Sequence, residues 1–248
     1  MTNRFRALAG GSALAAGLWF LASAVAAPPA LPKDSYQRAI KADVEFLQKK
    51  LDDLVADPQK NRGAIRTVKG VAMNIALYGE AIKDDALKSQ ALKVAEALDK
   101  KDFKAAAEAA KGLSAPKADA SVKGSKAFSL DDVMSPFRIA KAGGQNIEAD
   151  IKGAVKNGKI DAAEAELIGV RCTAIADYAI AMPNDKAATN KAMKDKWERW
   201  SKDMTTASKE LTEEAAKGKS ADEKKMLGIL KKLDNSCLNC HNDFRNEP

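Results

Sequence analysis

The spacing of apolar residues is the feature that most limits what this 248-residue chain can fold into. From residue 40 onward, apolar side chains recur at steps of three and four, and no segment alternates apolar and polar residues for long. Steps of this kind place apolar side chains on one stripe of an α-helix, whereas alternation would indicate strands. Alanine, lysine and leucine are abundant, and only 5% of residues are aromatic, which also favours helix. The sequence therefore predicts an all-α fold.

Several helices are expected in the first half of the chain. The first apolar stripe consists of Ile40, Val44, Leu47, Leu51 and Leu54. A second helix is expected from about Asn61 to Ile82, and alanine-rich helical segments from about Ala86 to Gly112. Residues 114–128 contain Pro, Gly and Ser without apolar periodicity, so they are predicted to be a linker.

Further helical segments are expected after the linker, and the first of them begins near Leu130. Asp161, with Glu164 three residues later, predicts the N-cap of a helix that ends near Met182. The next long helix carries a seam with steps of three and four, formed by Met193, Trp197, Trp200, Met204, Ala207 and Leu211.

The last helix is predicted to open with a capping box formed by Ser220 and Glu223. Its apolar stripe consists of Met226, Leu230, Leu233, Cys237, Cys240 and Phe244. Two cysteines thus lie on the face that such a helix buries, and this position needs an explanation.

The N-terminus resembles a secretory signal peptide. Two arginines precede an apolar run over residues 7–26, which ends in Ala24-Val25-Ala26, an A-x-A cleavage site. An uncleaved membrane anchor is the alternative, but the glycines and serines of the run lower its hydrophobicity. We therefore expect residues 1–26 to be removed and the rest to be periplasmic or otherwise exported, with no stable membrane span.

The charge of the exported chain is mildly basic. Removing residues 1–26 takes away two arginines and no acidic residue, which lowers the formal net charge from +7 to +5. The surplus is spread along lysine-rich segments without a concentrated basic run, so it does not indicate nucleic-acid binding. It favours encounter with an acidic partner.

Segments of the first half resemble segments of the second half. The offsets between matching segments are 107, 102 and 106 residues, so the matches stay nearly in register and indicate an ancient duplication. The matching pairs are residues 40–49 and 147–156, residues 68–72 and 170–174, and residues 108–115 and 214–221.

The stretch LDNSCLNCHNDFR, residues 233–245, contains two of the three cysteines and the only histidine of the chain. C-x-x-C-H is the attachment sequence of c-type haem: two thiols add to the vinyl groups, and the adjacent histidine becomes an axial iron ligand. On a helix, Cys237 and His241 lie one turn apart on one side, with Cys240 beside them. All three can therefore address one flat macrocycle.

Two other interpretations of these residues remain open. A redox disulfide between Cys237 and Cys240 would be expected at the start of a helix in a βαβ unit, and this motif lies late in a helix. A zinc site would need a fourth ligand besides Cys237, Cys240 and His241, such as Cys172 or a carboxylate. As a buried cysteine without a partner, Cys172 is otherwise explained as a small apolar residue.

The stretch CLNCHNDFR, at the end of the last helix of an exported helical chain, resembles the haem signature of the cytochrome c′ family, or class II cytochromes c. In that signature an aromatic residue and an arginine follow C-x-x-C-H. The resemblance covers about residues 130–248. It implies a four-helix bundle with one covalently attached haem c at one end of its core and His241 as the proximal ligand.

The resemblance also divides the chain. Residues 129–248 would form the four-helix-bundle, cytochrome c′-like haem domain, and residues 114–128 the linker. Residues 27–113 would be a related helical half that has no counterpart of Cys237, Cys240 and His241.

The first helix of the family supplies the distal side of the haem, so the resemblance makes Met134 the candidate second iron ligand. If Pro136 opens a new helical turn, Met134 lies just before that turn, and Phe137 or Leu130 would cover the iron instead. Arg245 matches the terminal arginine of the signature and is expected to pair with a haem propionate. Arg138 is a further candidate for that role.

The leading hypothesis is a non-enzymatic, exported monohaem cytochrome that transfers electrons to or from a redox partner protein, expected to be acidic. A five-coordinate haem that binds nitric oxide or carbon monoxide is the alternative. A haem enzyme is disfavoured because the chain has no second histidine for distal proton transfer. A zinc-binding helical module is the fourth hypothesis, and a homodimer is left open.

Overall fold

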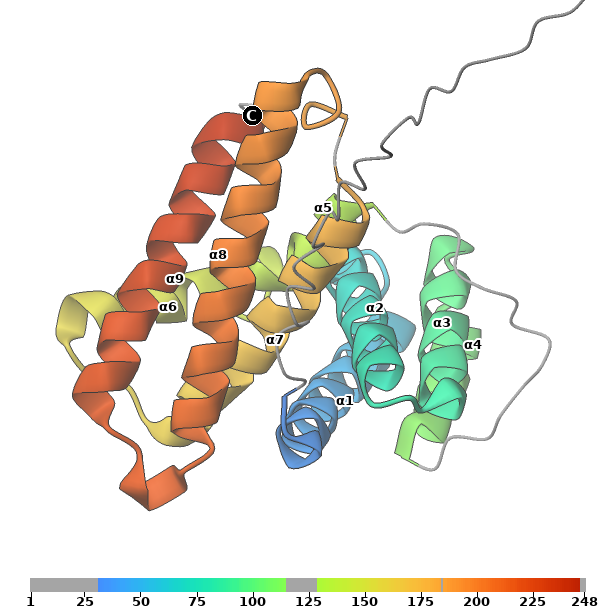
Figure 1. Ribbon diagram of the computed structural model, residues 1–248. Helices are drawn as coiled ribbons and strands as arrows, with labels where there is room; N and C mark the ends of the chain where they lie inside the picture. The colour runs from blue at the N-terminus through green and yellow to red at the C-terminus, as the bar shows by residue number, and fades with distance from the viewer. Residues whose placement is uncertain (1–30, 115–128, 184, 246–248) are drawn as a thin grey trace, which may run out of the picture.

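The computed structural model describes residues 31–114, 129–183 and 185–245 (Figure 1). Within these ranges the chain forms nine α-helices and short 3₁₀ turns, and it forms no strand. The prediction of an all-α fold is therefore confirmed. The expected signal peptide, residues 1–26, and residues 115–128 of the expected linker lie outside the described ranges.

The first half forms helices α1 (Lys33–Ala56), α2 (Ile65–Ala81), α3 (Asp85–Asp99) and α4 (Phe103–Lys111). Asp84 and Asp102 cap α3 and α4, because each side chain accepts a hydrogen bond from a backbone N–H of the first turn. Each helix packs against the next, and α4 returns to pack against α1.

The segment after the linker consists of a short helix and two 3₁₀ turns. Helix α5 (Leu130–Met134) has five residues and passes directly into the 3₁₀ turn Ser135–Phe137. Pro136 lies in the first positions of this turn, where its missing N–H costs nothing, so Met134 is the last residue before the turn. The chain then turns at Gly143, whose φ of 84° suits glycine, and enters α6 (Ile147–Asn157).

Three long helices complete the fold: α7 (Ala162–Ala181), α8 (Lys191–Ala215) and α9 (Glu223–Phe244). Helix α8 packs against both α7 and α9, and α9 also contacts α6. The predicted N-cap of α7 is confirmed, because Asp161 Oδ1 accepts a hydrogen bond from the Glu164 N–H at 2.9 Å.

The cap of α9 differs from the predicted capping box. Asp222 is the N-cap, and its Oδ1 accepts a hydrogen bond from the Lys225 N–H at 3.0 Å. Ser220 instead ends the 3₁₀ turn Gly218–Ser220. Glu223 Oε1 accepts a hydrogen bond from the Ile160 N–H at 3.1 Å, which ties the start of α9 to the residue just before α7.

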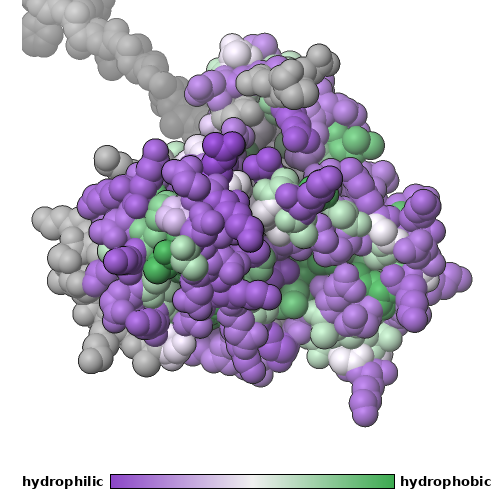
Figure 2. Space-filling model, turned by 180° about the vertical axis from the view of Figure 1, so that it is seen from behind, coloured by the Kyte–Doolittle hydropathy of each residue, from purple (hydrophilic) through white to green (hydrophobic). Residues whose placement is uncertain are grey.

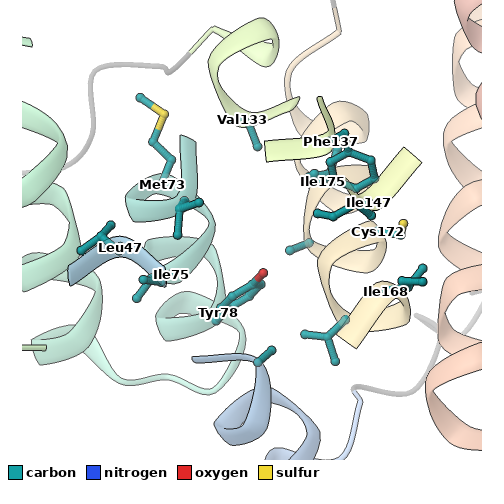
Figure 3. Packing of buried hydrophobic residues seen from close by; sticks show 14 of the residues in the cluster. Leu47, Met73, Ile75, Tyr78, Val133, Phe137, Ile147, Ile168, Cys172 and Ile175 are labelled. Carbon is teal, nitrogen blue, oxygen red and sulfur yellow. The ribbon is translucent and has the colours of Figure 1, made fainter. Parts of the chain in front are cut away.

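Both halves of the chain contribute to one buried apolar cluster. Figure 3 shows Leu47, Met73, Ile75 and Tyr78 from the first half, and on the other side residues of α5, α6, α7 and the 3₁₀ turn. The latter residues are Val133, Phe137, Ile147, Ile168, Cys172 and Ile175. The outer surface is mainly hydrophilic on the face shown in Figure 2, with apolar patches between the polar side chains.

Buried polar bonds join α1 to α7 inside this common core. Asp43 is fully buried, and its Oδ1 accepts hydrogen bonds from Arg171 Nη2 at 2.5 Å and from Gln145 Nε2 at 2.9 Å. Its other carboxylate oxygen accepts from the Tyr78 hydroxyl at 2.9 Å. These three hydrogen-bond donors belong to α2, to the segment before α6 and to α7, so the carboxylate holds α1 to three other segments.

The matching sequence segments occupy partly equivalent elements. Residues 40–49 lie in α1 and residues 147–156 in α6, while residues 68–72 lie in α2 and residues 170–174 in α7. The third pair lies at the ends of α4 and α8, which hold different places in the order of helices. Like α9 on α6, α4 packs against α1, but α4 has only 9 residues and α9 has 22.

Candidate functional site

The candidate site lies in the last two turns of α9. The buried face of this helix is formed by Met226, Ile229, Leu230, Leu233, Ser236 and Phe244. Cys237, Cys240 and His241 are half-buried at the edge of this face, whereas Leu238 between them is 51% exposed. The two cysteines therefore border the stripe on which the sequence placed them.

The three side chains of the C-x-x-C-H sequence form a compact set. Cys237 and His241 are four positions apart in continuous helix, which places them one above the other on one side of α9. Cys237 and Cys240 are both free thiols. The helix ends directly after the set, where the Arg245 N–H donates to the His241 carbonyl oxygen at 2.9 Å.

Burial controls the protonation of both thiols. Burial, followed by the nearby Cys240 and Asp234, raises the pKa of Cys237 to about 12. Burial and Asp243 raise the pKa of Cys240 to about 11. Both thiols therefore stay protonated at neutral pH, whereas thiols of redox C-x-x-C sites have lowered pKa values at helix N-termini.

The imidazole of His241 is held in its neutral form. Its pKa is lowered by burial first, then by the positive charge of Arg245, and Glu148 only partly offsets this. A neutral imidazole keeps a nitrogen lone pair available as a metal ligand.

Helix α6 places an ion pair beside the site. Lys152 Nζ lies 2.6 Å from Glu148 Oε1. Burial raises the pKa of Glu148, but the hydrogen bond from Lys152 and the positive charges of Lys152 and Arg245 outweigh it, so the pKa is lowered overall. The carboxylate is thus negative and faces the end of α9 that carries the histidine.

Helix α8 covers the other side of the site with aromatic side chains. The rings of Trp197 and Phe244 meet edge to face with centroids 5.0 Å apart, and the Trp197 Nε1–H donates to the Ala179 carbonyl oxygen at 2.8 Å. We call the buried group Ala179, Ala187, Trp197 and Phe244 the aromatic cluster. Leu130, Met193, Trp200 and Cys240 pack against the aromatic cluster.

Hydrogen bonds join the first turns of α8 to the C-terminal end of α9. Asp243 accepts a hydrogen bond from Trp200 Nε1 at 2.9 Å and from Lys196 Nζ at 2.9 Å. Arg199 lies over the Trp200 ring, 4.3 Å from its centroid. The site is therefore built on two helices whose mutual orientation is fixed by packing and by hydrogen bonds.

The remaining predicted residues lie at different depths. Met134 is half-buried at the end of α5 and packs against the main core, while Phe137 is 6% exposed within that core. Leu130 also borders the main core, and of the α5 residues it is the one that packs against the aromatic cluster. Arg138 and Arg245 are exposed.

The structure adds residues that the sequence reasoning did not single out. Glu148, Lys152 and Asp243 lie beside the motif. The spacing of four residues between Glu148 and Lys152 signals their ion pair, and the spacing of three between Cys240 and Asp243 places that carboxylate beside the thiol. Cys172 is fully buried in α7, where burial and the neighbouring Cys237 raise its pKa well above the ordinary value. The third cysteine thus lies close to the first thiol of the motif.

Searches against models of protein families, curated proteins and solved structures find no match for this chain. Among residues 31–114, 129–183 and 185–245, no helix is both long and apolar enough to cross a bilayer. In the same part of the chain, no group of three or more His, Cys, Asp and Glu side chains is arranged to hold a metal ion.

Proposed function

We propose that this chain is an exported monohaem c-type cytochrome that transfers electrons. The observation that carries the proposal is the arrangement of two free thiols and a neutral imidazole on one side of α9, in the order C-x-x-C-H. The residues fit a covalently attached haem, because both thiols are unpaired and the imidazole lies within one turn of them.

In this proposal Cys237 and Cys240 form the two thioether bonds and His241 is the proximal ligand. Residues 129–248 form the cytochrome c′-like four-helix-bundle domain, in which α5 supplies the distal side, and Arg245 pairs with a propionate. When bound, haem supplies an iron ion that accepts and releases one electron. The aromatic cluster and the ends of α8 and α9 keep the attachment site rigid and exclude water from its inner side.

The protonated thiols support this proposal over a redox disulfide. A C-x-x-C pair that exchanges disulfides uses a thiolate, which a helix N-terminus or nearby cations stabilise. Cys237 and Cys240 lie instead near a helix C-terminus, whose partial charge is negative, and burial raises both pKa values.

Gas binding is a second candidate function, and the position of Leu130 favours it. Leu130 of α5 packs against the aromatic cluster that Cys240 also borders. An apolar side chain cannot ligate iron, so a distal face covered by Leu130 in place of Met134 would leave the iron open to nitric oxide or carbon monoxide.

Intact mass spectrometry of the exported protein tests haem attachment. The chain is produced in a periplasm with haem-attachment machinery, and we expect its mass to exceed that of the mature polypeptide by one haem. The variant with both Cys237→Ser and Cys240→Ser should lose the entire increment, because no thiol remains at the site to form a thioether.

Cys172→Ala is the matched control, since it removes the third cysteine and leaves the C-x-x-C-H sequence unchanged. It should retain the full increment. Wild-type protein that is exported, folded and free of covalent haem would contradict the proposal.

A further inference from the structure

The distal candidate segment is attached to the first half of the chain. Helix α5 and the following 3₁₀ turn pack against α2, and Figure 1 shows α5 beside the end of α2. The Ser135 hydroxyl donates to the Arg66 carbonyl oxygen at 2.8 Å. Thr67 Oγ1 donates in turn to the Ser135 carbonyl oxygen at 3.4 Å.

Charged bonds reinforce this contact. Asp132 of α5 accepts from Arg66 Nε at 3.0 Å and from Lys69 Nζ at 3.0 Å. Lys69 also pairs with Asp99 at the end of α3, at 2.5 Å. The side chains of Lys69 and Asp132 are only 18% and 19% exposed, so this bridge between α3, α2 and α5 is partly shielded from water.

A glycine lets the two backbones meet. A Cβ atom added at Gly70 would lie 2.2 Å from the Asp132 carbonyl oxygen and 2.4 Å from Ser135 Oγ. Both distances are far below van der Waals contact, so α5 can occupy its position only because residue 70 has no side chain.

The other end of α5 reaches the candidate site. Leu130 packs against the aromatic cluster, which contains Phe244 of α9 and which Cys240 borders. Val133 is fully buried in the main core, so α5 cannot shift without disturbing both its neighbours. A continuous chain of packed groups therefore runs from α2 through α5 to the end of α9.

We propose that Arg66, Lys69 and Gly70 of α2 position α5 beside the haem-attachment site, so that the first half of the chain controls access to the iron. This inference rests on the proposed function. It makes the three α2 residues positioning residues, because they act through Leu130 and Met134 and touch no part of the attachment motif.

Gly70→Ala tests the inference in the full-length haem-loaded protein. The new methyl group should push α5 away from α2, so amide hydrogens of residues 130–138 should exchange about ten times faster or more. Carbon monoxide should bind the reduced protein about ten times faster, because the side chains that cover the iron are displaced. The attached haem, followed by mass, should be unchanged.

Gly153→Ala is the matched control. It makes the same substitution in the interior of helix α6, and a Cβ there meets nothing within 4 Å. Both variants gain the same helix propensity, so only the contact with α5 distinguishes them. Gly153→Ala should leave exchange in residues 130–138 and the rate of carbon monoxide binding unchanged.

Lys69→Met supplies a second variant that adds no steric clash. It removes the bridge to Asp132 and should alter the same two readouts in the same direction. Lys88→Met is its control, because Lys88 pairs with Glu80 at 3.1 Å within the first half.

Hydrogen exchange tests the packing of α5 on α2, gas binding tests control of the iron, and haem attachment tests the proposed function. Unchanged exchange in both Gly70→Ala and Lys69→Met would overturn the docking of α5 by α2. Faster exchange with unchanged gas binding would overturn control of the iron. If the wild type carries no covalent haem, the proposed function and control of the iron both fail, and exchange alone still decides whether α2 holds α5.

Discussion

Glu214 shows how a single side chain connects two helices near the start of α9. Its carboxylate accepts from Lys217 Nζ at 2.7 Å, from Lys225 Nζ at 2.6 Å and from the Asp222 N–H at 3.1 Å. These hydrogen bonds, that from Lys217 first, lower the pKa of Glu214 from 4.5 to about 2. The ionised carboxylate thus fastens the end of α8 to the cap of α9.

A pH dependence follows from this lowered pKa. Because the folded-state pKa lies below the ordinary value, Glu214 stabilises the fold fully above pH 4.5 and loses this effect as the pH falls toward about 2. Glu214→Gln should therefore lower the free energy of unfolding at pH 7, and the difference from wild type should shrink between these two pH values.

Urea unfolding across that pH range measures the effect. Glu213→Gln removes an exposed neighbouring carboxylate and should give a small difference that does not follow the same curve. A Glu214→Gln difference that is constant with pH would contradict the role of the ionised carboxylate.

At the residue scale the sequence identified the motif but not its surroundings. Cys237, Cys240 and His241 lie within five consecutive residues, so their spacing alone predicts that they share one side of a helix. Glu148 of α6 reaches the motif through tertiary packing, to which no local spacing corresponds, whereas Asp243 lies in α9 itself, three residues after Cys240. The effect of Glu148 on His241 therefore depends on the packing of α6 against α9.

At the scale of elements, two helices can pack closely where a glycine leaves no side chain between them. A Cβ at Gly169 of α7 would lie 2.3 Å from Thr212 Oγ1 and 2.9 Å from the Ser208 carbonyl oxygen, both in α8. Gly169→Ala should therefore separate α7 from α8 and lower the free energy of unfolding by about 1–3 kcal/mol.

For Gly228→Ala in α9 we expect the opposite change in stability. Its Cβ meets nothing within 4 Å, so the substitution should raise the free energy of unfolding by about 0.5–1 kcal/mol through helix propensity. Chemical denaturation compares the two variants directly. A stabilising Gly169→Ala would show that α7 and α8 are not packed as closely as described.

The positions of the helices are predicted well by apolar spacing and by capping residues. Asp161 caps α7 as predicted, whereas the cap of α9 is Asp222, two residues after the predicted Ser220. Ser220 and Asp222 are both polar residues near the start of the apolar stripe of α9, and the local sequence does not decide which of them caps the helix. Helix α5 ends at Met134 because Pro136 lies in a separate 3₁₀ turn, which is one of the two possibilities that the sequence left open.

At the scale of the whole molecule, the buried Asp43–Arg171 pair joins the two halves. The side chains are only 1% and 12% exposed, so removing either partner leaves a buried charge without its counter-charge. Asp43→Ala should lower the free energy of unfolding by about 3–5 kcal/mol. Asp52→Ala, an exposed position of the same helix, should have little effect.

The shared core also predicts one cooperative unfolding transition. Trp197 and Trp200 are the tryptophans that follow residue 30, so fluorescence reports the second half, whereas far-UV circular dichroism reports all helices. The two denaturation curves should coincide. Separate transitions would mean that residues 27–113 and 129–248 unfold independently.

The association of the two halves could not be derived from the sequence. Asp43 and Arg171 are 128 residues apart, and each belongs to a helix with a regular apolar stripe or an apolar surface. A charged residue in such a helix is normally exposed, so its burial depends on a partner that only the tertiary structure supplies. The repeated segments predicted related halves, and they did not predict a common core.

The visible absorption spectrum of the exported protein tests the central claim most directly. The protein is produced with haem-attachment machinery and measured oxidised, reduced with dithionite, and reduced under carbon monoxide. We predict a Soret band and a reduced α band that persist after acid–acetone extraction of free haem, because the haem is bound through Cys237 and Cys240. Folded protein without a Soret band would contradict the claim.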